Sequence, residues 1–258
     1  MSQLAHDAAR LARIGRKGGR RAGSTRRSVT VIRAMRFTLA FSLLLCASCA
    51  APMTQKIVLP PPGTLPPIVQ AGHPVLRSKA EDVPKEKIAT PEFAALVQTM
   101  IDTMRAAPGV GLAAPQIGVP WRVIVLEDRE ALITKLSDLE QKERERVPFA
   151  PRVFVNPTLT QVGEEKVTFF EGCLSVAGFA GLVERAAEVE VHGLDEHGEP
   201  QTWRVRGWPA RILQHEVDHI DGRLYVDRMR TRSFSTQEQV KQRFAGKSIS
   251  AILAELGW

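Results

Sequence analysis

Residues 211–219 read Arg-Ile-Leu-Gln-His-Glu-Val-Asp-His, and the rest of the chain is organised around this stretch. Two histidines four positions apart lie on one face of a helix, about one turn from each other, so His215 and His219 can reach a single metal ion. Glu216 stands beside them as a carboxylate next to a metal-activated water. The spacing therefore predicts a hydrolytic metal site. The alternative is that both histidines are ordinary core residues and that Glu216 lies on the surface. This alternative is disfavoured because two histidines at this spacing with a glutamate between them are a specific signal for a metal site.

The class of this metal site depends on its third ligand. Astacin-like endopeptidases place a histidine six residues after the second histidine of the motif, and this chain has Tyr225 there. The other histidines, which we expect at strand ends or in solvated loops, are His6, His73, His192 and His197. The remaining candidate is Cys173, the only cysteine after residue 49. Considered alone it is typical of a small buried apolar residue, but with two histidines it completes a catalytic site that has one open position.

Three stretches resemble, in the same order, the three motifs of the peptide deformylase family. They are Gly-Val-Gly-Leu-Ala-Ala-Pro-Gln at residues 109–116, Glu-Gly-Cys-Leu-Ser at residues 171–175 and Gln-His-Glu-Val-Asp-His at residues 214–219. The similarity extends from about residue 72 to about residue 229. The features that are similar to the organellar, type 1A subgroup, which also occurs in some bacteria, are Phe179, the pair Gly207-Trp208 and the turn Asn156-Pro157.

The resemblance implies an enzyme that removes the N-formyl group from the N-terminal formyl-methionine of newly made polypeptides and releases formate. It also implies that Cys173, His215 and His219 bind one divalent metal ion, with Glu216 as general acid and base. Deformylases are similar to one another in using Fe²⁺ natively while tolerating other ions. One thiolate with two imidazoles suits Fe²⁺, Zn²⁺, Ni²⁺ or Co²⁺, and an exposed pair of Fe²⁺ and thiolate is expected to be oxygen-sensitive.

The glycine-rich segment formed by Gly109, Val110 and Gly111 allows a tight turn and a close approach of the backbone to a ligand. A phosphate-binding loop is disfavoured, because Lys and Ser/Thr do not follow the glycines and no helical pattern begins there. By resemblance, this backbone holds the substrate peptide in an extended conformation. Gln116 ends the segment and by resemblance points its amide into the active site, whereas the alternative is a solvated side chain before a turn.

Donors for the oxyanion of a tetrahedral intermediate are implied by the same resemblance. They are the side-chain amide of Gln116 and the backbone N–H of Leu174, the residue after the metal-binding cysteine. For Asp218, a surface or structural ion pair is favoured over a role in orienting a neighbouring residue. The candidates for the wall of a methionine pocket, which core packing explains equally well, are Val110, Phe179 and Trp208.

The positive charge of the chain is concentrated at its beginning. Residues 1–36 carry nine Arg and one Lys against the single acid Asp7, a balance of +9, and because the whole chain carries +7, the remainder carries −2. Nucleic-acid binding needs clustered Lys and Arg on the folded part to neutralise phosphates. We therefore expect no direct binding of nucleic acid by the catalytic domain.

Two targeting interpretations of the leader stay open. An Arg- and Ser-containing start that is poor in acids resembles a mitochondrial transit peptide. Alternatively, translation begins at Met35, and the apolar run that follows resembles a bacterial signal peptide with a lipoprotein cleavage box before Cys49, although Cys46 stands where an aliphatic residue is usual. The run is too short for a spanning helix. The expected location is a compartment with formyl-methionine translation, which is the bacterial cytoplasm or the mitochondrial matrix. The alternative location is the bacterial envelope, with a lipid anchor at Cys49.

The predicted fold class is α+β, with antiparallel sheets packed around the central metal-binding helix in a single catalytic domain. We expect an amphipathic helix that begins at Thr90-Pro91, and a charged loop with a helical turn at residues 127–146. Strands are expected at residues 121–126, 153–155, 161–162, 166–170, 188–192 and 201–206, of which the last two form a hairpin. A capping box at residues 235–238 opens a short helix, and another helix is expected at residues 249–256.

The chain divides into four predicted parts. These are a basic leader with an apolar targeting segment at residues 1–56, a Pro-rich linker at 57–71, the catalytic domain at 72–230 and a surface-docked or mobile helical tail at 231–258. The expected partners are N-formylated nascent peptides, and one alternative is that the protein meets them at the ribosome. Membrane contact is expected only if the leader is an anchor. The rival functions are a metal-dependent endopeptidase and a catalytically idle, lipid-anchored binding protein.

Overall fold

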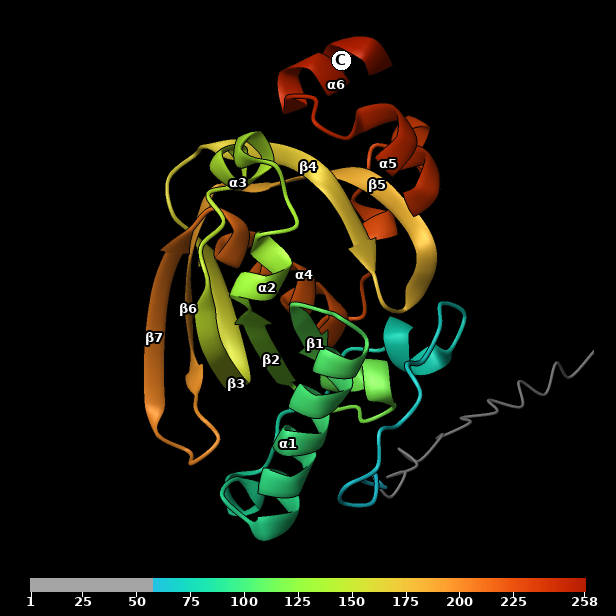
Figure 1. The fold of residues 1–258 in the computed structure, drawn as a ribbon. Coiled ribbons are helices and arrows are strands. Elements are labelled where there is room, and N and C mark those ends of the chain that lie inside the picture. The colour runs from blue at the N-terminus through green and yellow to red at the C-terminus, as the bar shows by residue number, and fades with distance from the viewer. Residues whose placement is uncertain (1–57) are drawn as a thin grey trace, which may run out of the picture. The chain divides into compact units, whose positions relative to one another are not determined.

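In the part of the chain that the structure describes, the strands form two antiparallel sheets, and strands of both sheets contact the central helix α4 (Trp208–Ile220), as Figure 1 shows. The first sheet has the order β1-β2-β3-β6-β7 and contains β1 (Gly111–Ala113), β2 (Val123–Asp128), β3 (Phe149–Gln161), β6 (Glu188–Leu194) and β7 (Pro200–Arg206). The second has the order β4-β5-β8 and contains β4 (Lys166–Cys173), β5 (Val176–Ala186) and β8 (Ser235–Thr236). This arrangement confirms the predicted α+β fold with antiparallel sheets around the metal-binding helix.

The computed structural model describes residues 58–258. The predictions for the basic leader, the start at Met35 and the anchor at Cys49 concern residues outside this range. All described residues belong to one compact unit, while the boundaries at residues 72 and 230 stay predictions. In residues 58–258 no helix has the length and apolar character needed to cross a membrane.

Helix α4 has local reasons to begin and end where it does. Pro209 stands in its first turn, where the missing N–H of proline leaves no helical hydrogen bond unmade. Its N-cap, Gly207, has a φ of +73°, and a Cβ there would lie 2.5 Å from the Cβ of Glu145. The helix buries Ala210, Ile212, Leu213 and Ile220 against the first sheet. Glycine is favoured at position 207 for two reasons: the positive φ, and the lack of space for a Cβ next to Glu145.

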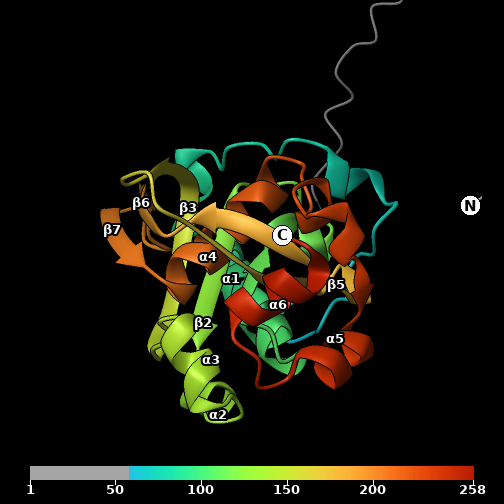
Figure 2. The same ribbon diagram turned by 90° about the horizontal axis from the view of Figure 1, so that it is seen from above.

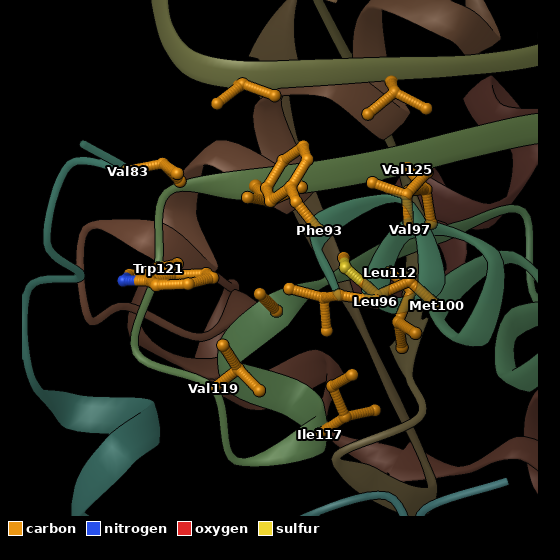
Figure 3. Close-up of a cluster of buried hydrophobic side chains, with 14 of the residues drawn as sticks. Val83, Phe93, Leu96, Val97, Met100, Leu112, Ile117, Val119, Trp121 and Val125 are labelled. Carbon is orange, nitrogen blue, oxygen red and sulfur yellow. The ribbon is translucent and has the colours of Figure 1, made fainter. Parts of the chain in front are cut away.

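Helix α1 (Pro91–Ala106) forms as the sequence predicted. The hydroxyl of Thr90 accepts a hydrogen bond from the backbone N–H of Phe93 at 3.2 Å, and Pro91 occupies the first turn. Its apolar face is buried together with residues of the first sheet, as Figure 3 shows for this cluster. The buried residues that α1 contributes are Phe93, Leu96, Val97, Met100 and Met104.

The charged segment that follows β2 contains two short helices, α2 (Glu130–Ile133) and α3 (Asp138–Glu143), rather than one helical turn in a loop. Its end is held by an ion pair in which Arg146 donates two hydrogen bonds, of 2.6 and 2.9 Å, to the buried Asp128. The tail contains two helices, α5 (Gln237–Phe244) and α6 (Ile249–Leu256). Short 3₁₀ helices lie at Pro74–Arg77, Lys85–Lys87, Ala114–Ile117, Tyr225–Asp227 and Thr231–Ser233.

Two local predictions need correction. The strands expected at residues 153–155 and 161–162 are one strand, β3, because the Asn156-Pro157 pair forms a bulge instead of a turn. The pairing with β6 jumps there, and Asn156, with a φ of 51°, exchanges hydrogen bonds with the backbone of Val83 at 2.8 and 3.0 Å. The cap of α5 is Thr236 rather than Ser235, since its hydroxyl accepts from the N–H of Gln239.

Replacing Leu213 by Ala should lower the free energy of unfolding by about 2–5 kcal/mol, because the side chain is fully buried between α4 and the first sheet. Urea unfolding followed by circular dichroism measures the change. The matched control is Leu65→Ala, since Leu65 is 57% exposed and its loss should cost less than about 0.5 kcal/mol. Equal losses in the two variants would contradict the packing described for α4.

Candidate metal centre

The three predicted metal ligands come together from two elements. Cys173 ends β4, while His215 and His219 lie one turn apart on α4. Each offers one ligand atom, and these atoms all lie within 4.8 Å of one another. The Sγ of Cys173 lies 3.2 Å from the Nε2 of His219. The geometry thus joins a strand end and a helix face that the sequence separates.

Position 225, where astacin-like endopeptidases would have a histidine, holds a buried aromatic ring. The ring of Tyr225 stacks on His215, with a centroid separation of 6.3 Å and an interplanar angle of 18°. It also packs in a small cluster with Cys173 and Val183. Tyr225 therefore packs against two of the predicted metal ligands, His215 and Cys173. It does not belong to the group of candidate ligands, Cys173, His215 and His219.

Glu171 orients His215, a role that the sequence analysis did not assign. One carboxylate oxygen of Glu171 accepts a hydrogen bond from the Nδ1 of His215 at 2.9 Å, so Nε2 is the ring nitrogen left for a metal. Burial by itself would raise the pKa of Glu171, but Arg185 and the hydrogen bond from His215 hold that pKa well below its usual range. The sequence could have pointed to Glu171, because this residue stands two positions before Cys173 in a predicted strand. Residues two apart in a strand have their side chains on the same face.

A buried network of charges holds Glu171 in place. Arg185 donates two hydrogen bonds of 2.9 Å to its carboxylate, and Arg211 donates one of 2.6 Å. Arg185 also pairs with Asp218, which accepts two further hydrogen bonds of 2.7 Å from Arg228. The sequence analysis favoured a surface or a structural ion pair for Asp218. Because Asp218 is only 4% exposed, its ion pairs are structural and buried.

Glu216 lies beside the ligand group in a site that leaves one of its oxygens free. Its side chain is buried, and among residues 58–258 no hydrogen-bond partner is found for Oε2. A Cβ on Gly111 would lie 2.2 Å from the other oxygen, so any other residue at this point of β1 would force the carboxylate to shift. Burial raises the pKa of Glu216 to about 7, against a lowering effect of the nearby His215. These are the surroundings of a proton-transferring carboxylate.

Gln116 is buried and points its amide at the ligand group, which is the orientation that the resemblance implied. Its Oε1 accepts a hydrogen bond from the N–H of Ala113 at 2.8 Å, and this bond leaves the amide N–H groups for the site. The Nε2 lies 3.7 Å from the Sγ of Cys173 and donates to the hydroxyl of Ser175 at 3.3 Å. The alternative, a solvated side chain, is wrong because Gln116 is only 2% exposed.

A pocket of about 540 Å³ opens over these groups. Besides Cys173, His215 and Glu216, its lining includes the predicted residues Gly109, Val110, Gly111, Gln116, Leu174 and Trp208. The structure does not bring Phe179 to this pocket, because its ring stacks on Phe234 at 5.0 Å and both rings are about two-fifths exposed, at 39% and 43%. Arg144 and Gln237 line the pocket although the sequence analysis did not single them out.

The residues present fit a divalent transition metal. One thiolate and two imidazoles make the three protein ligands of a catalytic site, which leaves a coordination position for water or substrate. His215 is already oriented through its other nitrogen by Glu171, and Glu216 aims an unpartnered oxygen into the same buried space. The pocket connects that space with solvent, so a metal held there is accessible to a substrate.

The chain is similar to proteins of one family along most of its described length. A family model described as "Polypeptide deformylase" matches residues 65–235. The chain is 49% identical over 176 residues to "Peptide deformylase 1A, chloroplastic" of Solanum lycopersicum, covering 68% of this chain and 64% of that protein. It is 44% identical over 184 residues to "Peptide deformylase, mitochondrial" of Homo sapiens, covering 70% of this chain and 75% of that protein. The match to the tomato protein thus spans slightly less than two thirds of its length.

A solved structure gives the same result. The Met-Ala-Ser-bound structure of a class I type b peptide deformylase from Acinetobacter baumannii has a TM-score of 0.58 and 34% sequence identity to this chain. The match covers 64% of this chain and 99% of that one. The fold is therefore shared with this relative over nearly its whole length.

Replacing Glu171 by Gln should weaken the binding of Zn²⁺ by about 10–100-fold, because His215 loses its charged acceptor. Competition with a chromophoric chelator measures the affinity, and thermal unfolding checks that the buried network has not collapsed. Glu184→Gln, on the exposed side of β5, is the control and should bind Zn²⁺ like the unmodified protein. An unchanged affinity in folded Glu171→Gln would contradict the orienting role.

Proposed function

Since this chain belongs to the polypeptide deformylase family, we propose that it removes the N-formyl group from the N-terminal formyl-methionine of newly made polypeptides and releases formate. The observation that carries the proposal is the joint placement of Cys173, His215 and His219 with Glu216 and Gln116 around one pocket. An endopeptidase is disfavoured because Tyr225 occupies the position of that class's third histidine. A catalytically idle binding protein would not need the free, buried oxygen of Glu216.

Proton transfer is the task of Glu216. A divalent metal held by Cys173, His215 and His219 supplies a Lewis acid and lowers the pKa of a bound water when it is present. Glu216 takes a proton from the attacking water on its free oxygen and later delivers it to the leaving amine nitrogen. The leaving amine needs this proton because an unprotonated amide nitrogen leaves poorly. The side chain of Glu216 is buried, so few water molecules compete with the reacting groups for this proton.

Stabilisation of the oxyanion is the task of Gln116 and Leu174. The amide of Gln116 is held in place through Ala113 and directs Nε2 toward the ligand group. Leu174 follows Cys173 in the turn between β4 and β5 and lines the same pocket. Donors that are fixed before the reaction stabilise developing charge without reorganisation, and losing one typically costs about 10²–10³-fold in rate.

The substrate peptide lies, in this proposal, along the edge of the first sheet. Among residues 58–258, β1 is an edge strand that pairs with β2, and Gly109 and Gly111 beside this edge line the pocket. An extended peptide can add to such an edge through main-chain hydrogen bonds. Val110 and Trp208 line the pocket and are proposed as walls for the methionine side chain. The Acinetobacter relative that holds Met-Ala-Ser supports a substrate of this kind.

Iron is the proposed native metal, and a compartment with formyl-methionine translation is the proposed location. The thiolate of Cys173 favours a soft or borderline ion over Mg²⁺ or Ca²⁺. The relatives named above come from a bacterium, a chloroplast and a mitochondrion, which supports the bacterial cytoplasm or an organelle. Ribosome association and the alternative of lipid anchoring through Cys49 are separate questions that palmitate labelling and ribosome co-sedimentation would answer.

Replacing Glu216 by Ala should reduce formate release from formyl-Met-Ala-Ser by at least about 10²–10⁴-fold, the usual contribution of general acid–base catalysis. The protein is purified without oxygen and loaded separately with Fe²⁺, Ni²⁺ or Zn²⁺, and its metal content is measured beside its activity. Glu164→Ala, at an exposed position, is the control. One bound metal per chain without formate release from the unmodified protein would refute the function, and casein cleavage would favour the endopeptidase.

Exposure to air should inactivate the iron-loaded protein but not the nickel-loaded protein, because an accessible Fe²⁺ beside the Cys173 thiolate promotes oxidation of both. Formate release before and after aeration measures the loss, and mass spectrometry locates any oxidised cysteine. The nickel-loaded sample serves as the control for unfolding in air. Full activity of the aerated iron-loaded sample would rule out iron as an oxygen-sensitive native metal.

A further inference from the structure

Residues 69–71, at the end of the predicted linker, contact the segments that carry both proposed oxyanion donors. The N–H of Val69 donates a hydrogen bond of 2.8 Å to the backbone carbonyl of Gln116, and the N–H of Ala71 donates one of 2.8 Å to the carbonyl of Ser175. Figure 2 shows the chain around these residues, in cyan, beside β5. This short segment therefore joins the end of the glycine-rich segment to the turn between β4 and β5.

The side chain of Gln70 connects this turn to the beginning of β5. Its Nε2 donates to the carbonyl oxygen of Leu174 at 3.0 Å, and its Oε1 accepts from the N–H of Ala177 at 3.4 Å, a long hydrogen bond. The same Nε2 also donates to the carbonyl oxygen of Ile68 at 3.1 Å, which holds the side chain beside its own backbone. Leu174 and Ala177 therefore share one partner that lies outside the hairpin.

The peptide group between Leu174 and Ser175 is held at both of its ends. Its carbonyl oxygen accepts from Gln70, and its N–H, which belongs to Ser175, donates to the Sγ of Cys173 at 3.3 Å. A peptide group is planar, so a rotation of this plane would change both contacts together. The adjoining peptide group carries the N–H of Leu174 and shares the Cα of that residue. A loss of the contact with Gln70 would therefore loosen the turn at both the thiolate and the proposed oxyanion donor.

We propose that Gln70 is a positioning residue that fixes this turn for the reaction, an inference that rests on the proposed function. Held in this way, the N–H of Leu174 faces the oxyanion and the N–H of Ser175 stays on the thiolate of Cys173. Gln70 is exposed and does not line the pocket, so it acts through the turn and not by touching the substrate. Groups that orient a metal ligand from outside typically contribute about 10–100-fold in metal affinity or activity.

Replacing Gln70 by Glu keeps the size of the side chain and the acceptor for Ala177 but removes the N–H that Leu174 accepts. With the full chain loaded with Co²⁺ and formyl-Met-Ala-Ser as substrate, kcat should fall about tenfold while KM changes less than about twofold, because the oxyanion forms only after the substrate has bound. Gln70→Ala should lose as much. The matched control is Gln98→Ala on α1, which removes an exposed side chain that donates to Asp102, and it should keep both constants.

The charge-transfer band between the Cys173 thiolate and bound Co²⁺ gives a second readout that needs no catalysis. In both Gln70 variants this band should move to longer wavelength, because hydrogen bonds tune a metal-bound sulfur and the N–H of Ser175 is then held less firmly. The band should stay in place in Gln98→Ala. Thermal unfolding of each variant checks that the fold is retained.

A kcat of both folded Gln70 variants within about twofold of that of the unmodified protein would overturn the positioning role. A loss that appears mainly in KM would overturn it as well, as would a charge-transfer band that neither variant shifts. Cobalt-loaded unmodified protein that releases no formate would instead refute the proposed function and the catalytic part of this inference. A band shift in the Gln70 variants would in that case still support the hold of Gln70 on the metal-binding turn.

Discussion

The carboxylate of Glu171 is the group on which the metal centre depends. It lies on β4, is held by Arg185 from β5 and Arg211 from α4, and accepts the hydrogen bond of His215. One buried anion therefore ties both strands of the hairpin to the helix that carries two of the ligands. Removing one partner from such a network leaves an uncompensated charge in a medium of low dielectric, which is strongly destabilising. The ligand geometry and the packing of α4 on the second sheet are thus maintained by the same contacts.

Close backbone approach is the second constraint on the site. Glu216 occupies the space in which a side chain at Gly111 would lie, and Gln237 does the same at Gly172. The two strands can pass Glu216 and Gln237 this closely because neither glycine has a side chain. A Cβ at Gly111 would force the buried carboxylate of Glu216 to move, whereas a Cβ at Gly172 would displace only the end of the exposed Gln237 side chain.

The tail contributes Gln237 to the lining of the pocket, although its helices follow the end of the family match at residue 235. Its apolar contacts form a cluster of their own, in which Leu182 of β5 packs with Phe244 and Ile252. This cluster is separate from the two larger ones around α1 and α4. The sequence left open whether the tail is surface-docked or mobile, and in the structure it is docked. This docking places Gln237, in the first turn of α5, at the lining of the pocket.

The sequence by itself determined the features that depend on local spacing. The four-residue separation of His215 and His219 and the alternation of the β6–β7 hairpin follow from the period of a helix or strand. The start of α1 follows from a capping residue, Thr90, that stands directly before a proline. The tertiary structure alone decided which side chains meet across distant segments: Glu171 with His215, Phe179 with Phe234 away from the pocket, and Gln237 with Gly172. It also turned the expected break at Asn156 into a bulge. Such contacts depend on how the two sheets pack around α4, and no local periodicity encodes that packing.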